Sequence, residues 1–476
     1  MRRLLFVGAI VLTMAVSGLS CGEHLEEELH QTASELRPTD PEDPAGYEGA
    51  ETDSLVSPGG HVRVFFATEG SHRPPQRDSN SSGVPDYVEM VAEIADEVGE
   101  FLENEGWRRP LSDSLFPSSE PLDLFLVDFS AGDGNYRVEA CGAFGTAEVC
   151  RGHLRIDNNF EPLYYPSVEY ALRVVISHEF FHAVQAAYQR LPPWWSEGTA
   201  TWFQEHFWAE QSDFERLTGP YFDDHERSLH DRQRGAFDSF AYGASIFVYF
   251  LEQQFGAQSI QEIFEAMGQG LDTIEGLESV LAEEGTSLAQ TFELFAAWNV
   301  FTGSRAVEGQ GYPEAERFQQ VSYLDIDADR GVDWNVAVGP LAVKYARIDG
   351  GRDVSLRAEW RVDFAQASLQ VVSPGEFAES GAVVVVGEEW VRFRAEELPI
   401  YVVVANGDVD EEGAVQVQLR GGDVGVEPEE DDIIEEVDED RSGGCATVPG
   451  SGGSGWLVLV LLVVLGERRA SPFSLP

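Results

Sequence analysis

The amino-acid sequence predicts an α+β domain followed by a small all-β domain. Between residues 59 and 320, short runs typical of strands precede a long region of helical periodicity. From residue 321 to 422 the pattern changes to short apolar runs separated by turn residues, which is typical of a β-sandwich. The length of 476 residues also exceeds that of one compact domain.

The elements of the first domain follow from their periodicity. His61 to Ala67 alternates as a strand does, and Leu122 to Val127 is a second run of strand length. Residues 86–105 carry apolar side chains at helical spacing. We expect a third short strand at His153 to Ile156, and helices from Ser167 to about Phe301.

The composition limits the possible partners. The formal net charge is -53, from 84 acidic and 31 basic residues. Such a chain repels the phosphates of nucleic acid and of anionic lipid. Hydrophobic residues make up 43% of the chain, which is enough for apolar cores. We therefore expect a folded protein that binds no nucleic acid.

The N-terminus is expected to be an export signal. Two arginines precede an apolar segment that is short for a membrane span, and small residues then lead to Cys21. The ending Gly-Leu-Ser-Cys resembles a bacterial lipobox, which implies lipid anchoring by lipoprotein-processing enzymes; simple secretion is the alternative. Residues 1–21 would then be a signal peptide and residues 22–58 an acidic linker.

The C-terminus is expected to hold a second signal. An acidic run and a Gly/Ser stretch predict a spacer over residues 423–455, and residues 456–476 carry a short apolar segment followed by two arginines. With Cys445, these features resemble in their order the C-terminal sorting signals of myxobacterial surface proteins. The resemblance implies processing by a sorting enzyme and display at the cell surface. The alternative is a weak membrane anchor, and in either case only the terminal signals contact the membrane.

The motif His-Glu-Phe-Phe-His, from His178 to His182, carries the candidate chemistry. On a helix that Ser167 can cap, the two histidines lie four residues apart, so both imidazoles face one side and can bind one zinc ion. Glu179 lies beside the first ligand and can serve as the general base for a water activated by zinc. The alternative is a helix with two ordinary histidines.

A catalytic zinc ion needs a third protein ligand. Residues 194–202, WWSEGTATW, offer Glu197 on a second helix that begins at Pro193 or Trp194, and Glu205 is a rival. HEFFH followed by WWSEGTATW resembles the gluzincin metallopeptidases, whose aminopeptidase branch has a similar segment. The resemblance covers residues 178–210. It implies a zincin-like fold, hydrolysis of peptide bonds and Glu197 as the third zinc ligand, but not aminopeptidase specificity, because the gap between the motifs is shorter here.

The same resemblance suggests two further parts of the site. The aminopeptidase relatives stabilise the oxyanion with a tyrosine on a following helix, and residues 239–256 resemble that helix, which makes Tyr242 the candidate. The alternatives for this role are Tyr221, His225 and His230. The loop from Cys141 to Cys150, whose two cysteines predict a disulfide in an exported protein, and the strand after it are expected at the edge of the cleft.

Residues 78–89, DSNSSGVPDYVE, match a twelve-residue calcium loop of the EF-hand type. Gly83 lies where such a loop turns sharply. The candidate Ca²⁺ ligands are Asp78, Asn80, Ser82, the carbonyl of Val84, Asp86 and Glu89. The alternative is a polar turn that caps a helix.

Together these patterns predict a secreted or surface-anchored zinc peptidase that acts on protein or peptide substrates. The main alternative is a surface adhesion or scaffolding protein with an inactive or structural zinc site, and a zinc hydrolase of non-peptide bonds is a second. Glu179 argues against the first alternative, because a structural site has no use for a general base.

Overall fold

The structure is a computed structural model, and it describes most of the chain between residues 36 and 421. The described ranges are 36–40, 42–43, 46–115, 119–129, 132–209, 213–235, 237–327, 329–350, 352–360, 367–372, 383–384, 387–394, 397–421 and 435–438. The expected signal peptide at residues 1–21 and the sorting segment at residues 456–476 lie outside them. Within these ranges no helix has the length and apolar character needed to cross a membrane.

The N-terminal part of the fold is a five-stranded sheet in the order β1-β2-β3-β5-β4. Its strands are β1 (Thr52–Val56), β2 (Val62–Ala67), β3 (Leu122–Val127), β4 (Gly134–Phe144) and β5 (Ala147–Asp157). β2, β3 and β5 run parallel, and β1 and β4 pair antiparallel at the two edges. The expected strand at His153 to Ile156 is thus an interior part of β5. The strand at the sheet edge is β4, because the chain reverses in the β4–β5 hairpin and β3 takes the other side of β5.

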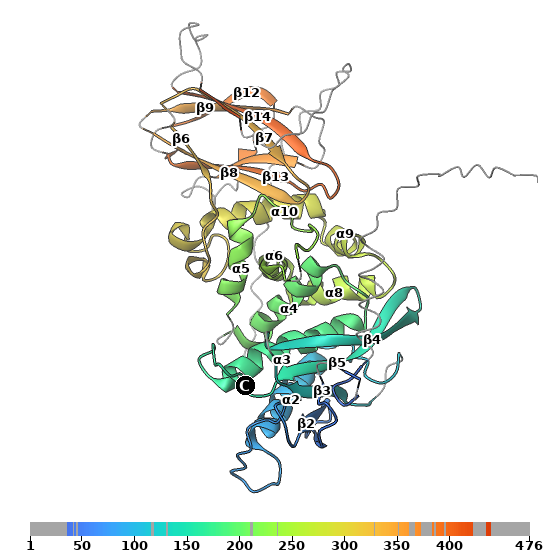
Figure 1. The fold of residues 1–476 in the computed structure, drawn as a ribbon. Helices are drawn as coiled ribbons and strands as arrows, with labels where there is room; N and C mark the ends of the chain where they lie inside the picture. Colours follow the sequence, from blue (N-terminus) through green and yellow to red (C-terminus); the bar gives the residue numbers. More distant parts are fainter. Residues whose placement is uncertain are drawn as a thin grey trace, which may run out of the picture.

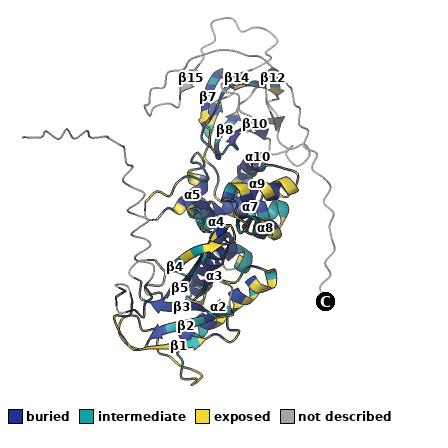
Figure 2. Cartoon of the chain, turned by 90° about the vertical axis from the view of Figure 1, so that its right-hand side faces the viewer, coloured by how far each residue is buried: buried dark blue, intermediate teal, exposed yellow. Residues whose placement is uncertain are grey.

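Helices cover one face of this sheet and the N-terminal segment contributes to the other. α2 (Asp86–Glu105) and α3 (Val168–Ala186) share an apolar core with the sheet (Figures 1 and 2). The segment expected to be a linker is folded where the structure describes it. β1 belongs to the sheet, and Arg37 forms ion pairs with Asp123 at 2.7 Å and Glu139 at 2.6 Å. These two carboxylates are almost fully buried, so they require a counter-charge.

The middle part of the chain is helical, as the periodicity predicts. Its helices are α4 (Pro193–Trp208), α5 (Phe214–Asp223), α6 (Ser239–Gly243), α7 (Ser245–Phe255), α8 (Ala257–Met267), α9 (Thr273–Glu283) and α10 (Leu288–Trp298). Short 3₁₀ turns follow at Asn299–Phe301, Gly303–Arg305 and Ala315–Arg317. The expected cap of α3 is present, because the hydroxyl of Ser167 accepts a hydrogen bond from the Tyr170 amide at 3.1 Å.

The C-terminal part consists of two five-stranded sheets that enclose one apolar core. The strands are β6 (Leu324–Asp327), β7 (Val332–Val338), β8 (Ala342–Asp349), β9 (Val354–Trp360), β10 (Ala367–Val372), β11 (Val383–Val384), β12 (Gly387–Phe393), β13 (Ile400–Asn406), β14 (Gly413–Gly421) and β15 (Glu435–Asp438). The sheet orders are β11-β10-β13-β8-β6 and β12-β9-β14-β7-β15. β15 lies in the segment for which the sequence predicts a spacer, and it pairs parallel with β7.

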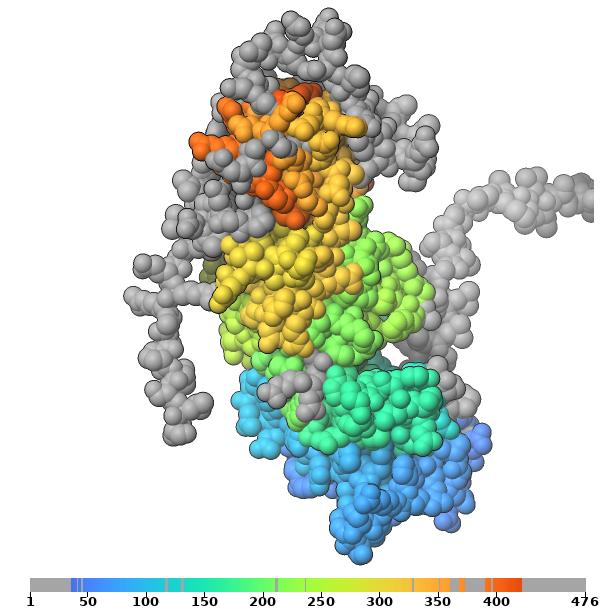
Figure 3. All heavy atoms as spheres, turned by 90° about the vertical axis from the view of Figure 1, so that its left-hand side faces the viewer, coloured from blue at the N-terminus to red at the C-terminus, as the bar shows by residue number. Residues whose placement is uncertain are grey.

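This β-sandwich is fused to the helices. The outer face of the β10-β13-β8 sheet packs against α10, and Val343, Tyr345 and Val403 belong to the same apolar cluster as the helical core. The hydroxyl of Tyr345 donates to the Ala296 carbonyl at 3.0 Å. Figures 1 and 3 show the sandwich resting directly on the helical part. The mixed α and β architecture confirms the expected α+β class.

A pH-dependent contribution to stability is expected from His206 on α4. Its ring nitrogens lie 2.9 Å from Glu105 of α2 and 2.8 Å from Glu252 of α7. Burial alone would lower the pKa of His206, but the two carboxylates outweigh it and raise the pKa to about 9. Because the pKa is raised, this stabilisation is complete below about pH 6.5 and is lost as the pH rises through about 9.

The expected size of this contribution is at most about 3 kcal/mol at low pH. Urea unfolding of the wild type and of His206→Gln at pH 6 and pH 9.5 measures it. The difference in unfolding free energy between the two proteins should shrink at pH 9.5. A difference that stays constant with pH would contradict the ionic role of His206.

Candidate metal centre

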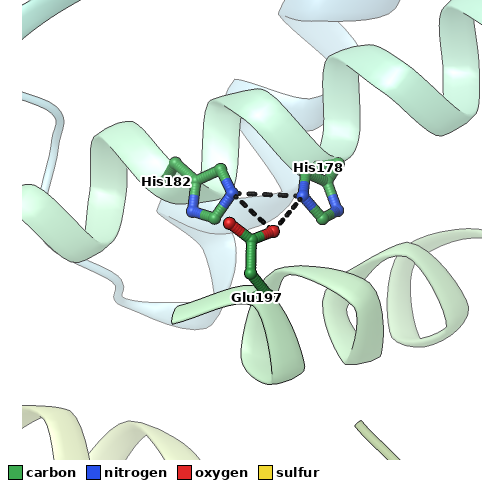
Figure 4. A group of neighbouring side chains, drawn as sticks. All are labelled: His178, His182 and Glu197. Carbon is green, nitrogen blue, oxygen red and sulfur yellow. Dashed lines mark hydrogen bonds and ion pairs between the residues drawn. The ribbon is translucent and has the colours of Figure 1, made fainter. Parts of the chain in front are cut away.

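Two neighbouring helices bring the three candidate zinc ligands together. His178 and His182 lie one turn apart on α3, and Glu197 lies in the first turns of α4 (Figure 4). The chain reverses between them at Leu191 and two prolines, and Pro193 occupies the first turn of α4, where its missing N–H leaves no helical hydrogen bond unmade. Glu197 therefore faces back toward the histidines across the interface between the helices.

The spacing of the donor atoms fits one tetrahedral zinc ion. Nε2 of His178 and Nε2 of His182 are 3.1 Å apart, and Oε2 of Glu197 lies 3.2 Å and 3.5 Å from them. Ligand atoms at zinc–nitrogen and zinc–oxygen distances are about 3.3 Å from one another in a tetrahedron. Across the described residues, this is the group of histidine, cysteine and carboxylate ligands that converges closely enough to hold an ion.

Two glutamines fix the orientation of the imidazoles. The amide nitrogen of Gln185 donates to the Ser196 carbonyl and the Thr199 hydroxyl, both at 2.8 Å, so its Oε1 faces Nδ1 of His182, also at 2.8 Å. In the same way, Gln204 donates to a backbone carbonyl of α3 at 3.2 Å, and its Oε1 faces Nδ1 of His178 at 3.3 Å. Both Nδ1 atoms therefore carry the proton, which leaves the Nε2 lone pairs free for a metal.

This arrangement favours a positive charge between the three side chains. Burial would raise the pKa of Glu197, but attraction to His182 and the hydrogen bonds that protonated imidazoles donate to the carboxylate hold that pKa far below its usual range. Burial would lower the pKa of His182, but Glu197 outweighs it and raises the pKa to about 9. Two nitrogen lone pairs and a carboxylate repel one another at these distances, and a proton or a metal cation relieves that repulsion.

Glu179 lies between the candidate metal ligands and the edge strand β4. Its side chain is 9% exposed, and burial raises its pKa. The backbone amide of Tyr136 on β4 hydrogen-bonds to it and partly opposes that rise. A Cβ atom on Gly134 would lie 2.6 Å from Val175 and 3.1 Å from Glu179, so β4 approaches the helix this closely because residue 134 is glycine.

Tyr242 lies beside the ligands, as the sequence predicts. Its ring stacks on the imidazole of His178, with centroids 5.6 Å apart and planes 11° apart. Burial and the neighbouring carboxylates Glu197 and Glu179 raise its pKa, so the phenol keeps its proton and can donate a hydrogen bond.

The alternative candidates for the tyrosine role are engaged elsewhere. Tyr221 is fully buried among aromatic rings of the helical core. His225 hydrogen-bonds to Val343, and His230 hydrogen-bonds to the Val409 carbonyl, so both histidines face the sandwich. The rival third ligand Glu205 does not join the converging group, and its neighbour His206 is held by two glutamates of other helices.

The candidate calcium loop forms a compact turn before α2. The carboxylate of Asp78 accepts hydrogen bonds from the amides of Ser82 at 3.1 Å and Gly83 at 3.0 Å, and Asn80 donates to Glu89 at 2.9 Å. Asp86 accepts from Ser79 at 2.7 Å. The carboxylates of Asp78, Asp86 and Glu89 do not converge as a group in this arrangement. Val84 lies in the same turn, and its carbonyl accepts a hydrogen bond from the Ser82 hydroxyl at 3.3 Å. The loop is thus a polar turn before α2 in which no side chain caps the first turn of the helix, and its role as a calcium site stays a prediction.

Gln185 and Gln204 are the functional residues that the sequence interpretation missed. Gln185 lies three residues after His182, a spacing that places two side chains on one helix face and could have pointed to it. Gln204 comes from the other helix, and its place beside His178 follows only from how α3 and α4 pack.

Removing the Gln204 acceptor should weaken zinc binding. In Gln204→Leu the side-chain volume is kept, but Nδ1 of His178 loses its partner, so we expect zinc affinity to fall by roughly 10- to 100-fold. Competition with a chromogenic chelator measures it. Gln261→Leu, at a buried glutamine of α8 outside the site, is the matched control and should bind zinc as the wild type does. Equal zinc affinity in Gln204→Leu and the wild type would contradict the orienting role.

Comparisons with known proteins add no family assignment. No protein-family model matches the chain, and no curated protein matches it.

Proposed function

We propose that this protein is an exported zinc peptidase of the gluzincin type. The observation that carries the proposal is the convergence of His178, His182 and Glu197 at the spacing of a tetrahedral zinc site, with a fourth side chain, Glu179, buried beside it. Three protein ligands leave one coordination position open, which is the pattern of catalytic rather than structural zinc sites. Burying a carboxylate that is not a ligand costs free energy, and groups with such a cost cluster at functional sites.

The residues of the chain have separate tasks in this mechanism. His178, His182 and Glu197 hold the zinc ion, which when bound lowers the pKa of water and polarises the substrate carbonyl. Glu179, whose pKa is raised by burial, accepts a proton from the attacking water and passes it to the leaving amine. The protonated phenol of Tyr242 donates a hydrogen bond to the oxygen on which negative charge develops.

An extended peptide is the substrate that suits the neighbouring edge strand. Among the strands that the structure describes, β4 pairs only with β5, so its other edge offers backbone donors and acceptors to a further strand. The strand begins at Gly134, in contact with Glu179, which would bring a paired peptide past the general base. The disulfide between Cys141 and Cys150 joins β4 to β5 near the tip of the hairpin and stiffens it.

The same disulfide supports an exported protein. Disulfides persist in oxidising compartments and are rare in the cytosol. We propose that the chain is exported and held at the cell surface or released. The proposal rests on this bond together with the terminal signals expected from the sequence.

Replacing the general base should abolish turnover without removing the metal. In Glu179→Gln we expect zinc content to be unchanged and cleavage of casein or gelatin to fall by roughly 10²- to 10⁴-fold, because proton transfer is lost. Metal analysis and product analysis by mass spectrometry measure the two effects.

Two glutamate variants on α4, one at a proposed ligand and one outside the ligand group, serve as matched controls. Glu197→Gln should lose zinc, while Glu205→Gln, on the same helix, should keep both zinc and activity. If the wild type binds zinc but cleaves no faster than Glu179→Gln, the peptidase proposal fails, and the adhesion or scaffolding alternative gains.

A further inference from the structure

Phe237 is an exposed aromatic side chain next to the candidate metal centre. Its side chain is 70% exposed, and its ring centroid lies 5.4 Å from that of Tyr242. Tyr242 in turn stacks on His178. A single exposed apolar residue is ordinary on a protein surface. What distinguishes Phe237 is that one aromatic ring separates it from a metal ligand.

The loop that presents Phe237 is held by buried charges. The next residue, Asp238, forms a two-point ion pair with Arg227 at 2.7 and 3.0 Å, and both side chains are less than a tenth exposed. The carboxylate of Asp238 also accepts hydrogen bonds from the amides of Arg234 at 2.7 Å and Phe240 at 3.2 Å. The amides of Arg234 and Phe240 are thus both bound to the carboxylate of Asp238, which follows Phe237 directly, so this ion pair supports the exposed ring.

We propose that Phe237 determines substrate specificity by forming an apolar platform for a bulky, preferably aromatic, side chain of the peptide close to the scissile bond. This inference rests on the proposed peptidase function and names the substrate class of that site. Phe237 touches Tyr242, the proposed oxyanion donor, so a peptide side chain covering its ring belongs to a residue near the reacting carbonyl. Covering the exposed ring removes apolar surface from water, and aromatic rings gain further from edge or offset contacts.

A scan of peptides tests this inference. The probes are an acetylated hexapeptide of alanine and serine and six versions of it, each with phenylalanine at one position. We expect the wild type to cleave at least one phenylalanine version with a kcat/KM roughly tenfold above that of the parent peptide. In Phe237→Ala this ratio should fall to near one while the kcat/KM for the parent peptide changes less than twofold. Phe237→Tyr should keep the ratio.

Two controls distinguish a role of Phe237 in substrate specificity from a role in positioning Tyr242. Val56→Ala removes an exposed apolar side chain on β1, at the edge of the sheet opposite β4. This variant should change neither the kcat/KM values nor their ratio. If Phe237→Ala lowers kcat/KM equally for the parent and phenylalanine peptides, Phe237 only supports Tyr242 and the inference is overturned. It is also overturned if the wild type cleaves the parent peptide and all six phenylalanine peptides with the same kcat/KM.

A binding measurement keeps this inference distinct from the proposed function. Calorimetry with Glu179→Gln, with and without added zinc, gives dissociation constants for the parent and phenylalanine peptides without turnover. A preference for phenylalanine that disappears in Glu179→Gln/Phe237→Ala supports the platform even if the wild type cleaves neither peptide. If Glu179→Gln binds both peptides equally, the platform is refuted whatever the turnover results.

Discussion

The packing of α4 against α3 is the constraint on which the site depends. It brings a carboxylate from one helix to 3.2 Å and 3.5 Å from two imidazoles of the other, whose facing nitrogens lie 3.1 Å apart. Such a contact between three electron-rich atoms is unfavourable unless a cation lies among them. The surrounding structure supplies what is needed to hold it, since Gln185 and Gln204 fix the rings and the aromatic core behind α3 and α4 fixes the helices. The site is therefore part of the core and does not depend on a surface loop.

The edge of the sheet is the second constraint. β4 passes directly against α3, and Gly134 removes the side chain that would otherwise separate the strand from Glu179. The same contact buries the carboxylate and lets the amide of Tyr136 reach it. One close approach thus sets both the pKa of the candidate base and its distance from an open strand edge. On the helical side of the candidate site, α6 carries Tyr242, whose ring stacks on His178.

Local patterns predicted the parts of this protein that depend on nearby residues. The helical spacing of apolar residues predicted α2, and their alternation predicted β2. The four-residue spacing of His178 and His182 predicted that both lie on one face of a helix. Non-local packing was not predictable in this way. The sheet edge depends on strand order, which periodicity does not encode. The folded segment around Arg37 depends on Glu139, which is 102 residues away in the chain. Gln204 likewise approaches His178 only through the packing of two helices.

The continuity of the apolar core between the helices and the sandwich has a consequence for how the chain can be divided. Tyr345, Val403 and their neighbours cover α10, so a protein ending near residue 320 would expose that helix face to water. The sandwich could not be detached as an independent module either, because its β10-β13-β8 sheet would then show an apolar outer surface. Exposed faces of this kind promote aggregation. The helical part and the sandwich should therefore fold and unfold together as one cooperative unit, although sequence patterns mark them as separate domains.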